Sequence, residues 1–103
     1  MTHSTIDHNV AELADLFRLL GDTTRLRILL SCLDEPIAVS DIANKLNLSQ
    51  PLVSHHLRLL RATHIVKANR QGRQMFYVAA DQHISGMLSN LLEHINEPYP
   101  EAD

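Results

Sequence analysis

Two pairs of potential metal ligands lie near the C-terminal end of the chain. Asp81 and His83 stand two positions apart, and His94 and Glu97 stand three apart. Carboxylate oxygen and imidazole nitrogen are both zinc ligands, and zinc sites in proteins are mostly four-coordinate. One helix cannot bring both pairs to one ion, because the eleven positions from His83 to His94 span roughly 16 Å of helical rise.

A second copy of the same helix would bring the two pairs together. In antiparallel helices related by a two-fold axis, the numbers of facing residues have a constant sum. The numbers of Asp81 and Glu97 add to 178, and those of His83 and His94 add to 177, so both combinations fit nearly one register. The axis then lies between positions 87 and 89, and the dimer has two equivalent sites.

The apolar pattern of this stretch favours such a dimer. Positions 80–97 carry apolar residues at spacings of three and four, which predicts an amphipathic helix. Surface helices also carry His, Asp and Glu without binding metal, so this pattern alone leaves that alternative open. We assign to the dimer interface Ile84, Met87, Leu88, Leu91, Leu92 and Ile95.

The composition predicts one small helical domain. A chain of 103 residues with 45% hydrophobic and 4% aromatic residues suits a Leu/Ile/Val/Ala core, and dimerisation would increase its buried apolar surface. No apolar run approaches the ~20 residues of a membrane span, and the first residues do not resemble a signal peptide. The single cysteine, Cys32, lies in an apolar run, so we expect a buried thiol and a cytoplasmic location.

The charges are segregated along the chain. Positions 42–80 contain no Asp or Glu but six basic residues, although the formal net charge of the whole chain is −3. A basic segment inside an acidic protein is typical of a surface that binds a polyanion.

Four helices are expected before the last one. Apolar spacing and capping residues place them at 10–20, 23–33, 41–46 (opened by Ser40) and, after a cap at Ser49, up to position 62. We expect residues 1–8 and 98–103 to be disordered, with His3 and His8 as possible accessory metal ligands. On the fourth helix we place Leu52, Val53, Leu57, Leu59 and Leu60 toward the core.

The third and fourth helices form a helix-turn-helix pattern, and a β-hairpin follows it. The hairpin strands are expected at 65–68 and 74–78, with Gly72 in the turn. A hairpin in this position is a wing, which gives the fold α-α-α-α-β-β-α. The predicted DNA-binding residues are Ser40, Gln50, Pro51, Ser54, His55, Arg58, Lys67, Arg70, Gln71 and Arg73.

Three segments resemble the ArsR/SmtB family of metal-sensing repressors: D-T-T-R-L-R-I-L at 22–29, S-Q-P-L-V-S-H-H-L-R-L-L at 49–60 and R-Q-G-R at 70–73. The resemblance covers roughly residues 8–97. It implies a winged-helix homodimer that represses metal-efflux or metal-handling genes. The metal-free dimer would hold operator DNA with an inverted repeat, and metal would release it.

The resemblance also bears on the metal. The stretch 38–41 lacks the cysteines of the thiolate-binding subgroup, whereas Asp81, His83, His94 and Glu97 match the D-x-H and H-x-x-[HE] pattern of the last-helix subgroup. Two imidazoles and two carboxylates suit Zn(II), with Co(II) as a substitute. Pro98 disfavours helical geometry at Glu97, so water could replace that ligand.

The family resemblance further implies a relay from His94 to a backbone carbonyl near His64, at the end of the recognition helix. Two alternatives stay open: a repressor that senses nickel or cobalt with help from His3 and His8, or one that senses a non-metal or redox signal, for example through Cys32. An enzyme is not expected, because no nucleophile–base pair or Gly-rich phosphate loop is evident.

Overall fold

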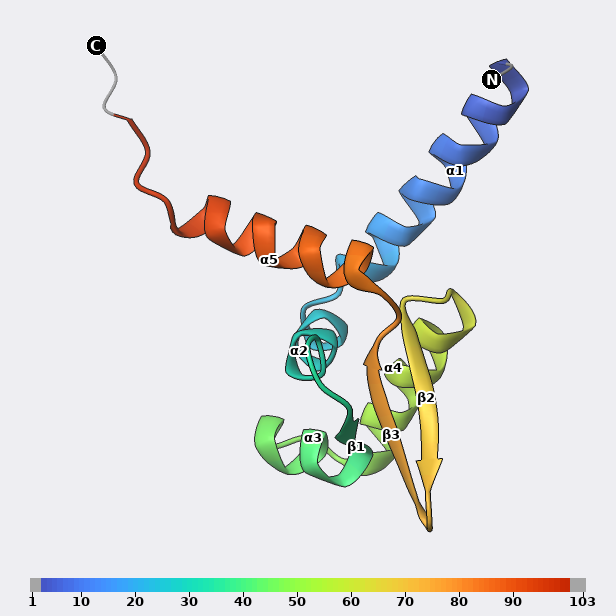
Figure 1. Cartoon of the computed structure of the whole chain (residues 1–103), viewed down its shortest axis with the longest axis vertical. Helices are drawn as coiled ribbons and strands as arrows, with labels where there is room; N and C mark the ends of the chain where they lie inside the picture. Colours follow the sequence, from blue (N-terminus) through green and yellow to red (C-terminus); the bar gives the residue numbers. More distant parts are fainter. Residues whose placement is uncertain (1–2, 101–103) are drawn as a thin grey trace.

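The computed structural model describes residues 3–100, with side chains from residue 6 onward. The described part contains five helices and one three-stranded sheet (Figure 1). In chain order the elements are α1 (His3–Leu20), α2 (Thr23–Ser31), β1 (Ile37–Ala38), α3 (Val39–Leu46), α4 (Gln50–Ala62), β2 (Val66–Gln71), β3 (Gln74–Ala79) and α5 (Gln82–Asn96).

The predicted winged helix-turn-helix architecture is confirmed, with one strand added. The hairpin β2–β3 pairs antiparallel, and the sheet order is β1-β3-β2. The added strand β1 pairs Ile37 with Tyr77 and Ala38 with Phe76. A strand of two residues is too short to show an alternating pattern, so the sequence analysis missed it.

Two predicted helix starts are wrong. Residues 3–8, expected to be disordered, form the first turns of α1, while residues 1–2 lie outside the described part. Helix α3 begins at Val39 with Ala38 as its N-cap, so Ser40 lies inside the helix and does not open it. At the other end, residues 98–100 form no helix or strand, and 101–103 lie outside the described part.

The other helix starts follow the predicted capping chemistry. The Asp22 carboxylate accepts a hydrogen bond from the Arg25 backbone N–H at 2.8 Å, at the start of α2. The Ser49 hydroxyl accepts from the Leu52 N–H at 3.3 Å, and Pro51 occupies the first turn of α4. These side chains satisfy N–H groups that have no partner within the helix.

The core lies between α2, α3, α4 and the sheet. Cys32 is fully buried, which confirms the prediction, and burial raises the pKa of its thiol to about 12. On α4, Leu52 is exposed and Leu59 is only half-buried, contrary to the expectation that both face the core, while His56 is buried. The largest fully buried side chains are Ile28, Leu29, Ile42, Leu57, Leu60, Ile65, Val53 and Cys32.

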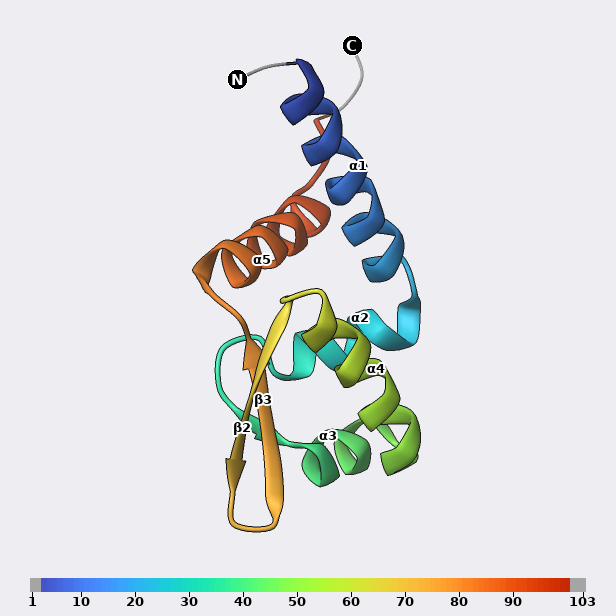
Figure 2. The same cartoon turned by 90° about the vertical axis from the view of Figure 1, so that its right-hand side faces the viewer.

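Helices α1 and α5 diverge from the body of the molecule (Figures 1 and 2). The drawn chain ends lie at one end of the molecule, and the hairpin tip lies at the opposite end. None of the described helices is long and apolar enough to cross a membrane. The molecule therefore has two distinct ends, one formed by α1 and α5 and the other by the hairpin and α3.

A left-handed turn ends the recognition helix α4. His64 has φ 61°, its N–H donates to the Arg61 carbonyl at 3.0 Å, and the Ile65 N–H donates to the Leu60 carbonyl at 2.9 Å. This pattern ends many helices, and glycine usually occupies the left-handed position. A histidine there carries backbone strain, because its Cβ crowds the following carbonyl oxygen.

We predict that His64→Gly raises the free energy of unfolding by about 1 kcal/mol, because glycine adopts a positive φ without steric cost. Urea unfolding at fixed protein concentration measures the change. Asn47→Gly is the matched control, since Asn47 also has a positive φ of 56° but asparagine tolerates it better. A loss of stability in His64→Gly would show that the imidazole makes contacts that outweigh the strain.

Candidate nucleic-acid interface and metal centre

Helix α4 presents a polar face to solvent and an apolar face to the core. Gln50, His55 and Arg58 are exposed and Ser54 is half-buried, whereas Val53 on the opposite face is fully buried. The polar set offers amide, hydroxyl, imidazole and guanidinium groups, which can contact base edges and phosphates. Pro51 is also exposed, in the first turn.

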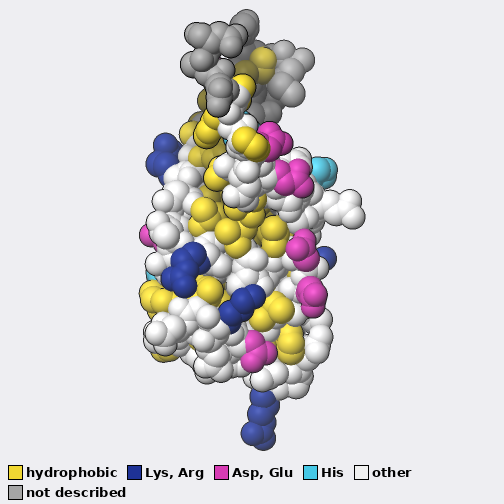
Figure 3. Space-filling model, turned by 90° about the vertical axis from the view of Figure 1, so that its left-hand side faces the viewer, with side chains coloured by type: hydrophobic (Ala, Val, Ile, Leu, Met, Phe, Trp, Pro, Cys, Tyr) yellow, Lys and Arg dark blue, Asp and Glu magenta, His cyan; other side chains and the backbone are white. Residues whose placement is uncertain are grey.

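The hairpin carries the remaining predicted basic residues. Lys67, Arg70, Gln71 and Arg73 are all exposed, and the last ladder pair joins Gln71 to Gln74. Gly72, with φ 64°, provides the left-handed turn position. In Figure 3 a basic side chain projects from the lower end of the molecule, at the hairpin tip.

Three elements meet around a pocket of about 330 Å³ between α4 and the wing. It brings together four of the predicted DNA-binding residues from different elements: Ser40 from α3, Gln50 and Ser54 from α4, and Arg73 from the wing. The full lining is Ala38, Val39, Ser40, Gln50, Ser54, Arg73, Gln74 and Met75.

The N-terminal end of α5 carries the first candidate ligand pair. Asp81 is the N-cap: its Oδ1 accepts from the Ile84 N–H at 3.1 Å, and its Oδ2 lies 3.6 Å from His83 Nδ1. The hydrogen bond from Ile84, with a smaller contribution from His83, lowers the pKa of the Asp81 carboxyl. Ligand atoms of a tetrahedral zinc ion are about 3.3 Å apart, given bonds of about 2 Å. The pair thus fits adjacent positions on such an ion.

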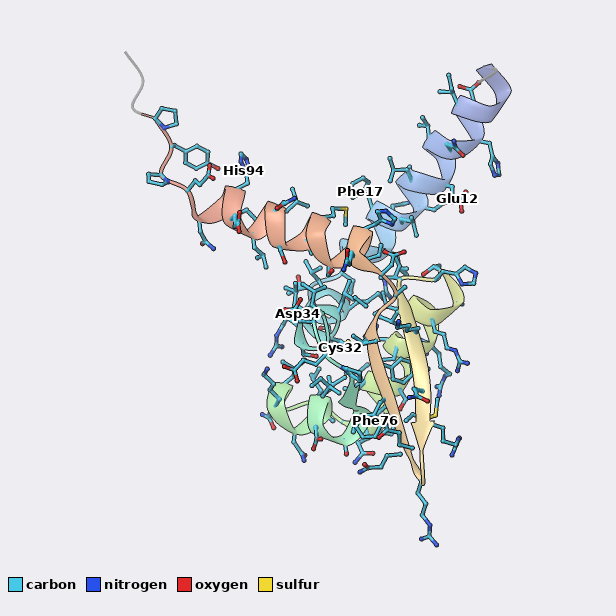
Figure 4. The ribbon with its side chains drawn as sticks, in the orientation of Figure 1. Glu12, Phe17, Cys32, Asp34, Phe76 and His94 are labelled. Carbon is cyan, nitrogen blue, oxygen red and sulfur yellow. The ribbon has the colours of Figure 1, made fainter. Side chains whose placement is uncertain are left out.

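The second pair lies at the other end of the helix. Figure 4 shows His94 far along α5, away from the body of the molecule. Glu97 is the C-cap with extended backbone (φ −71°, ψ 139°), as expected for a residue before proline. Among the described residues of a single chain, no three His, Cys, Asp or Glu side chains are grouped to hold a metal ion. The structure therefore does not join the two pairs within one chain.

Backbone hydrogen bonds tie the start of α5 to the domain. The Ala80 N–H donates to the Ile65 carbonyl at 2.9 Å, and the Ala79 N–H donates to the Cys32 carbonyl at 3.0 Å. Asp81 follows directly after these two residues, and Ile65 directly follows His64 at the end of α4. The first candidate ligand is therefore three covalent or hydrogen-bonded steps from the recognition helix.

The predicted interface residues of α5 fall into three groups. Leu88 is buried in the core of the single chain, and Ile84 and Met87 are half-buried against that core. The distal residues are exposed: Leu91 by 45%, Leu92 by 40% and Ile95 by 64%.

The sequence analysis missed a second apolar stripe, on α1. Its members recur at helical spacing, and Figure 4 places Phe17 near the junction of α1 and α5. In Figure 3 apolar side chains gather over the part of the molecule where these helices lie. The spacing was readable, but half of it lies in the segment expected to be disordered. The exposed members are Ile6, Val10, Leu13 and Phe17.

A buried histidine on α4 was also missed. His56 is 8% exposed, and its Nδ1 has no hydrogen-bond partner among the described residues; the same holds for Arg25 Nε. Burial and then the nearby Arg25 charge lower the pKa of His56, opposed by Asp22, while His55 adds to the lowering. The recognition helix thus packs against α2 through a neutral imidazole.

Comparison with known proteins identifies the family. The family model "Bacterial regulatory protein, arsR family" matches residues 22–68. A CadC homolog of Staphylococcus aureus, a cadmium resistance transcriptional regulatory protein, is 32% identical over 90 residues, which cover 86% of this chain and 74% of that protein. The chain belongs to the arsR family.

Other arsR-family relatives add detail. The transcriptional repressor SmtB homolog of Synechocystis is 34% identical over 86 residues; the match covers 84% of this chain but only 65% of that protein's length. A homodimeric winged helix-turn-helix DNA-binding domain of Mycobacterium bovis superposes with a TM-score of 0.82 over 99% of this chain and 97% of the other. At 20% identity this likeness concerns the fold alone. The family consists of regulators, which agrees with the expectation that the chain is not an enzyme.

We predict that the free energy of unfolding falls as pH decreases from about 7 to 5. His56 takes up a proton less readily when folded, so its contribution is complete above the unfolded-state pKa of about 6.5 and is lost as pH falls below that value. Urea unfolding across this range should show a shallower fall in His56→Leu. An unchanged pH dependence would show that His56 becomes protonated without cost in the folded state.

Proposed function

We propose that the chain is a metal-responsive transcriptional repressor whose metal-free homodimer binds operator DNA and whose zinc-bound form releases it. The observation that carries the proposal is the placement of the ligand pairs, Asp81 with His83 and His94 with Glu97, at opposite ends of α5. Each pair is half of a four-ligand set, and antiparallel pairing of two α5 helices completes both sets. Such a repressor works in the cytoplasm, where its operator lies.

The DNA-binding part of the proposal rests on charge and shape. The basic segment 42–80 forms α4 and the hairpin, at the end of the molecule away from α1 and α5. We place α4 in the major groove and the wing along the adjacent backbone and minor groove. In a symmetric dimer two such surfaces act together, so the operator is an inverted repeat.

The dimer part rests on the exposed apolar side chains. Leu91, Leu92 and Ile95 on α5 continue the stripe that begins at Ile84 and Met87. The α1 stripe lies beside them and adds further apolar surface. A single chain leaves this surface in water, and a two-fold partner would bury it.

The choice of zinc rests on the donor atoms. Two imidazoles and two carboxylates form a nitrogen and oxygen set that suits Zn(II), and Co(II) can replace it. A soft-metal site would need thiolates, and Cys32, the only cysteine, is buried and protonated. Ni(II) would need more ligands; on α1, His8 Nε2 lies 3.8 Å from Glu12 Oε2, so that imidazole already has a carboxylate neighbour. His3 has no described side chain.

The coupling part rests on the backbone link between α5 and α4. The register places His94 of the partner subunit beside His83, which lies three residues after Ala80, the donor to the Ile65 carbonyl. The partner's His94 thereby approaches the turn at His64. Metal bound there fixes an imidazole tautomer and the position of that turn. Coupling free energies of this kind are about 1–3 kcal/mol per effector.

We predict that the metal-free protein binds duplex DNA with strong salt dependence and that Arg58→Ala weakens binding roughly tenfold, or about 1.4 kcal/mol. If Arg58 contacts a phosphate, the slope of log K against log salt should become shallower by ~0.9. Fluorescence anisotropy measures both quantities. Arg18→Ala on α1 removes the same charge far from α4 and should bind as the wild type does. Equal losses in both variants would argue against this DNA-binding surface.

We predict two tight zinc ions per dimer in a competition titration against a chromophoric chelator. His94→Ala should lose this tight binding, while Asn90→Ala, an exposed position on the same helix, should keep it. A nickel titration alongside tests the alternative metal. Retention of both zinc ions in His94→Ala would refute the interchain site, and full zinc-induced DNA release in that variant would refute the relay.

A further inference from the structure

We propose that the pocket between α4 and the wing is a phosphodiester-binding site that holds one backbone phosphate of the DNA. The inference rests on the proposed DNA-binding function and deepens it. It assigns one shared ligand to residues that otherwise appear as separate contacts: Ser40, Gln50, Ser54 and Arg73.

The lining has the chemistry of an anion site. Five lining side chains carry hydrogen-bond donors, and the only charged one is a guanidinium; no Asp or Glu lines the pocket. A guanidinium matches the paired oxygens of a phosphate, and hydroxyl and amide groups supply further donors. Ala38, Val39 and Met75 contribute apolar surface, which limits the water that competes with these hydrogen bonds.

The position of the pocket selects the phosphate of a duplex over a free anion. Its walls come from α3, from the first turns of α4, and from the strand β3 with its turn. When α4 lies in the major groove and the hairpin lies toward the minor groove, the intervening DNA strand must cross the gap between them. That gap is this pocket, so a backbone phosphate is the group delivered to it.

The start of α3 adds to this assignment. Its N-cap is Ala38, which makes no side-chain cap hydrogen bond, unlike Asp22, Ser49 and Asp81 at the other helix starts with a recorded cap. Ala38 and Ser40 both line the pocket. A phosphate in the pocket would accept from the uncapped N–H groups, and Ser40 is free to donate its hydroxyl because it is not the cap.

The test combines a charge reversal with a double-mutant cycle. Ser40→Asp places a carboxylate in the pocket, and Asn44→Asp places the same charge on the exposed part of α3, outside the lining. We expect Ser40→Asp to weaken binding of the metal-free dimer to a mixed-sequence duplex by about tenfold or more, through like-charge repulsion. Asn44→Asp should weaken it by less than about threefold. Anisotropy titrations over a range of salt concentrations measure the affinities, and circular dichroism checks that each variant folds.

The cycle uses the two arginines of the hairpin. Arg73→Gln should have little further effect in the Ser40→Asp background, because both changes remove the same phosphate contact, whereas Arg70→Gln, outside the pocket, should act additively. Equal effects of Ser40→Asp and Asn44→Asp, or additivity of Ser40→Asp with Arg73→Gln, would overturn the pocket assignment while leaving DNA binding in place. Absence of salt-dependent DNA binding by the wild type would instead refute the proposed function.

A second measurement reads the pocket directly. Dimethyl phosphate added to isotope-labelled wild-type protein should shift the amide signals of Val39 and Ser40 and the side-chain signals of Gln50 and Arg73 in a saturable way. The same additions to Ser40→Asp should leave them unchanged. Equal, non-saturating shifts in both proteins would mean adventitious anion binding only, and would overturn the assignment.

Discussion

Two backbone hydrogen bonds decide where the last helix leaves the domain. The Ala79 N–H is held by the Cys32 carbonyl at the end of α2, and the Ala80 N–H by the Ile65 carbonyl just after α4. They extend the β2–β3 ladder by one residue and fix the direction in which α5 departs. Every ligand and every interface residue on α5 takes its position from this junction. Movement of α5 relative to the domain must therefore be transmitted to the end of α4.

The junction also explains why the molecule divides into two functional ends. The basic segment folds into α4 and the wing, and the acidic residues lie on α1, α2, α5 and the connections around them, apart from Asp41 in α3. An acidic protein can in this way present a positive surface in one direction only. The apolar stripes of α1 and α5 lie at the other end, so partner binding and polyanion binding do not compete for surface.

Much of this could be predicted because the signals are local. Asp22 and Ser49 cap helices, Gly72 turns the hairpin, and the spacing on α5 gives the helix and its ligand pairs. The missed features depend on tertiary contacts. β1 exists because β3 offers it an edge, and Leu88 and His56 are buried because of what packs against them. A sequence pattern reports which face is apolar, but it does not report what covers that face. Whether the ligand pairs join on one ion stays a prediction.

The separation of the ligand pairs along α5 has a consequence for the living cell. Because neither pair is a complete site, each metal centre in the proposed dimer depends on two chains, and the number of sensors varies with the square of chain abundance at low copy number. A cell that makes fewer copies would lose sensors faster than chains. Its response threshold would then depend on expression level as well as on the metal. A repressor that limits its own synthesis would hold that threshold steady.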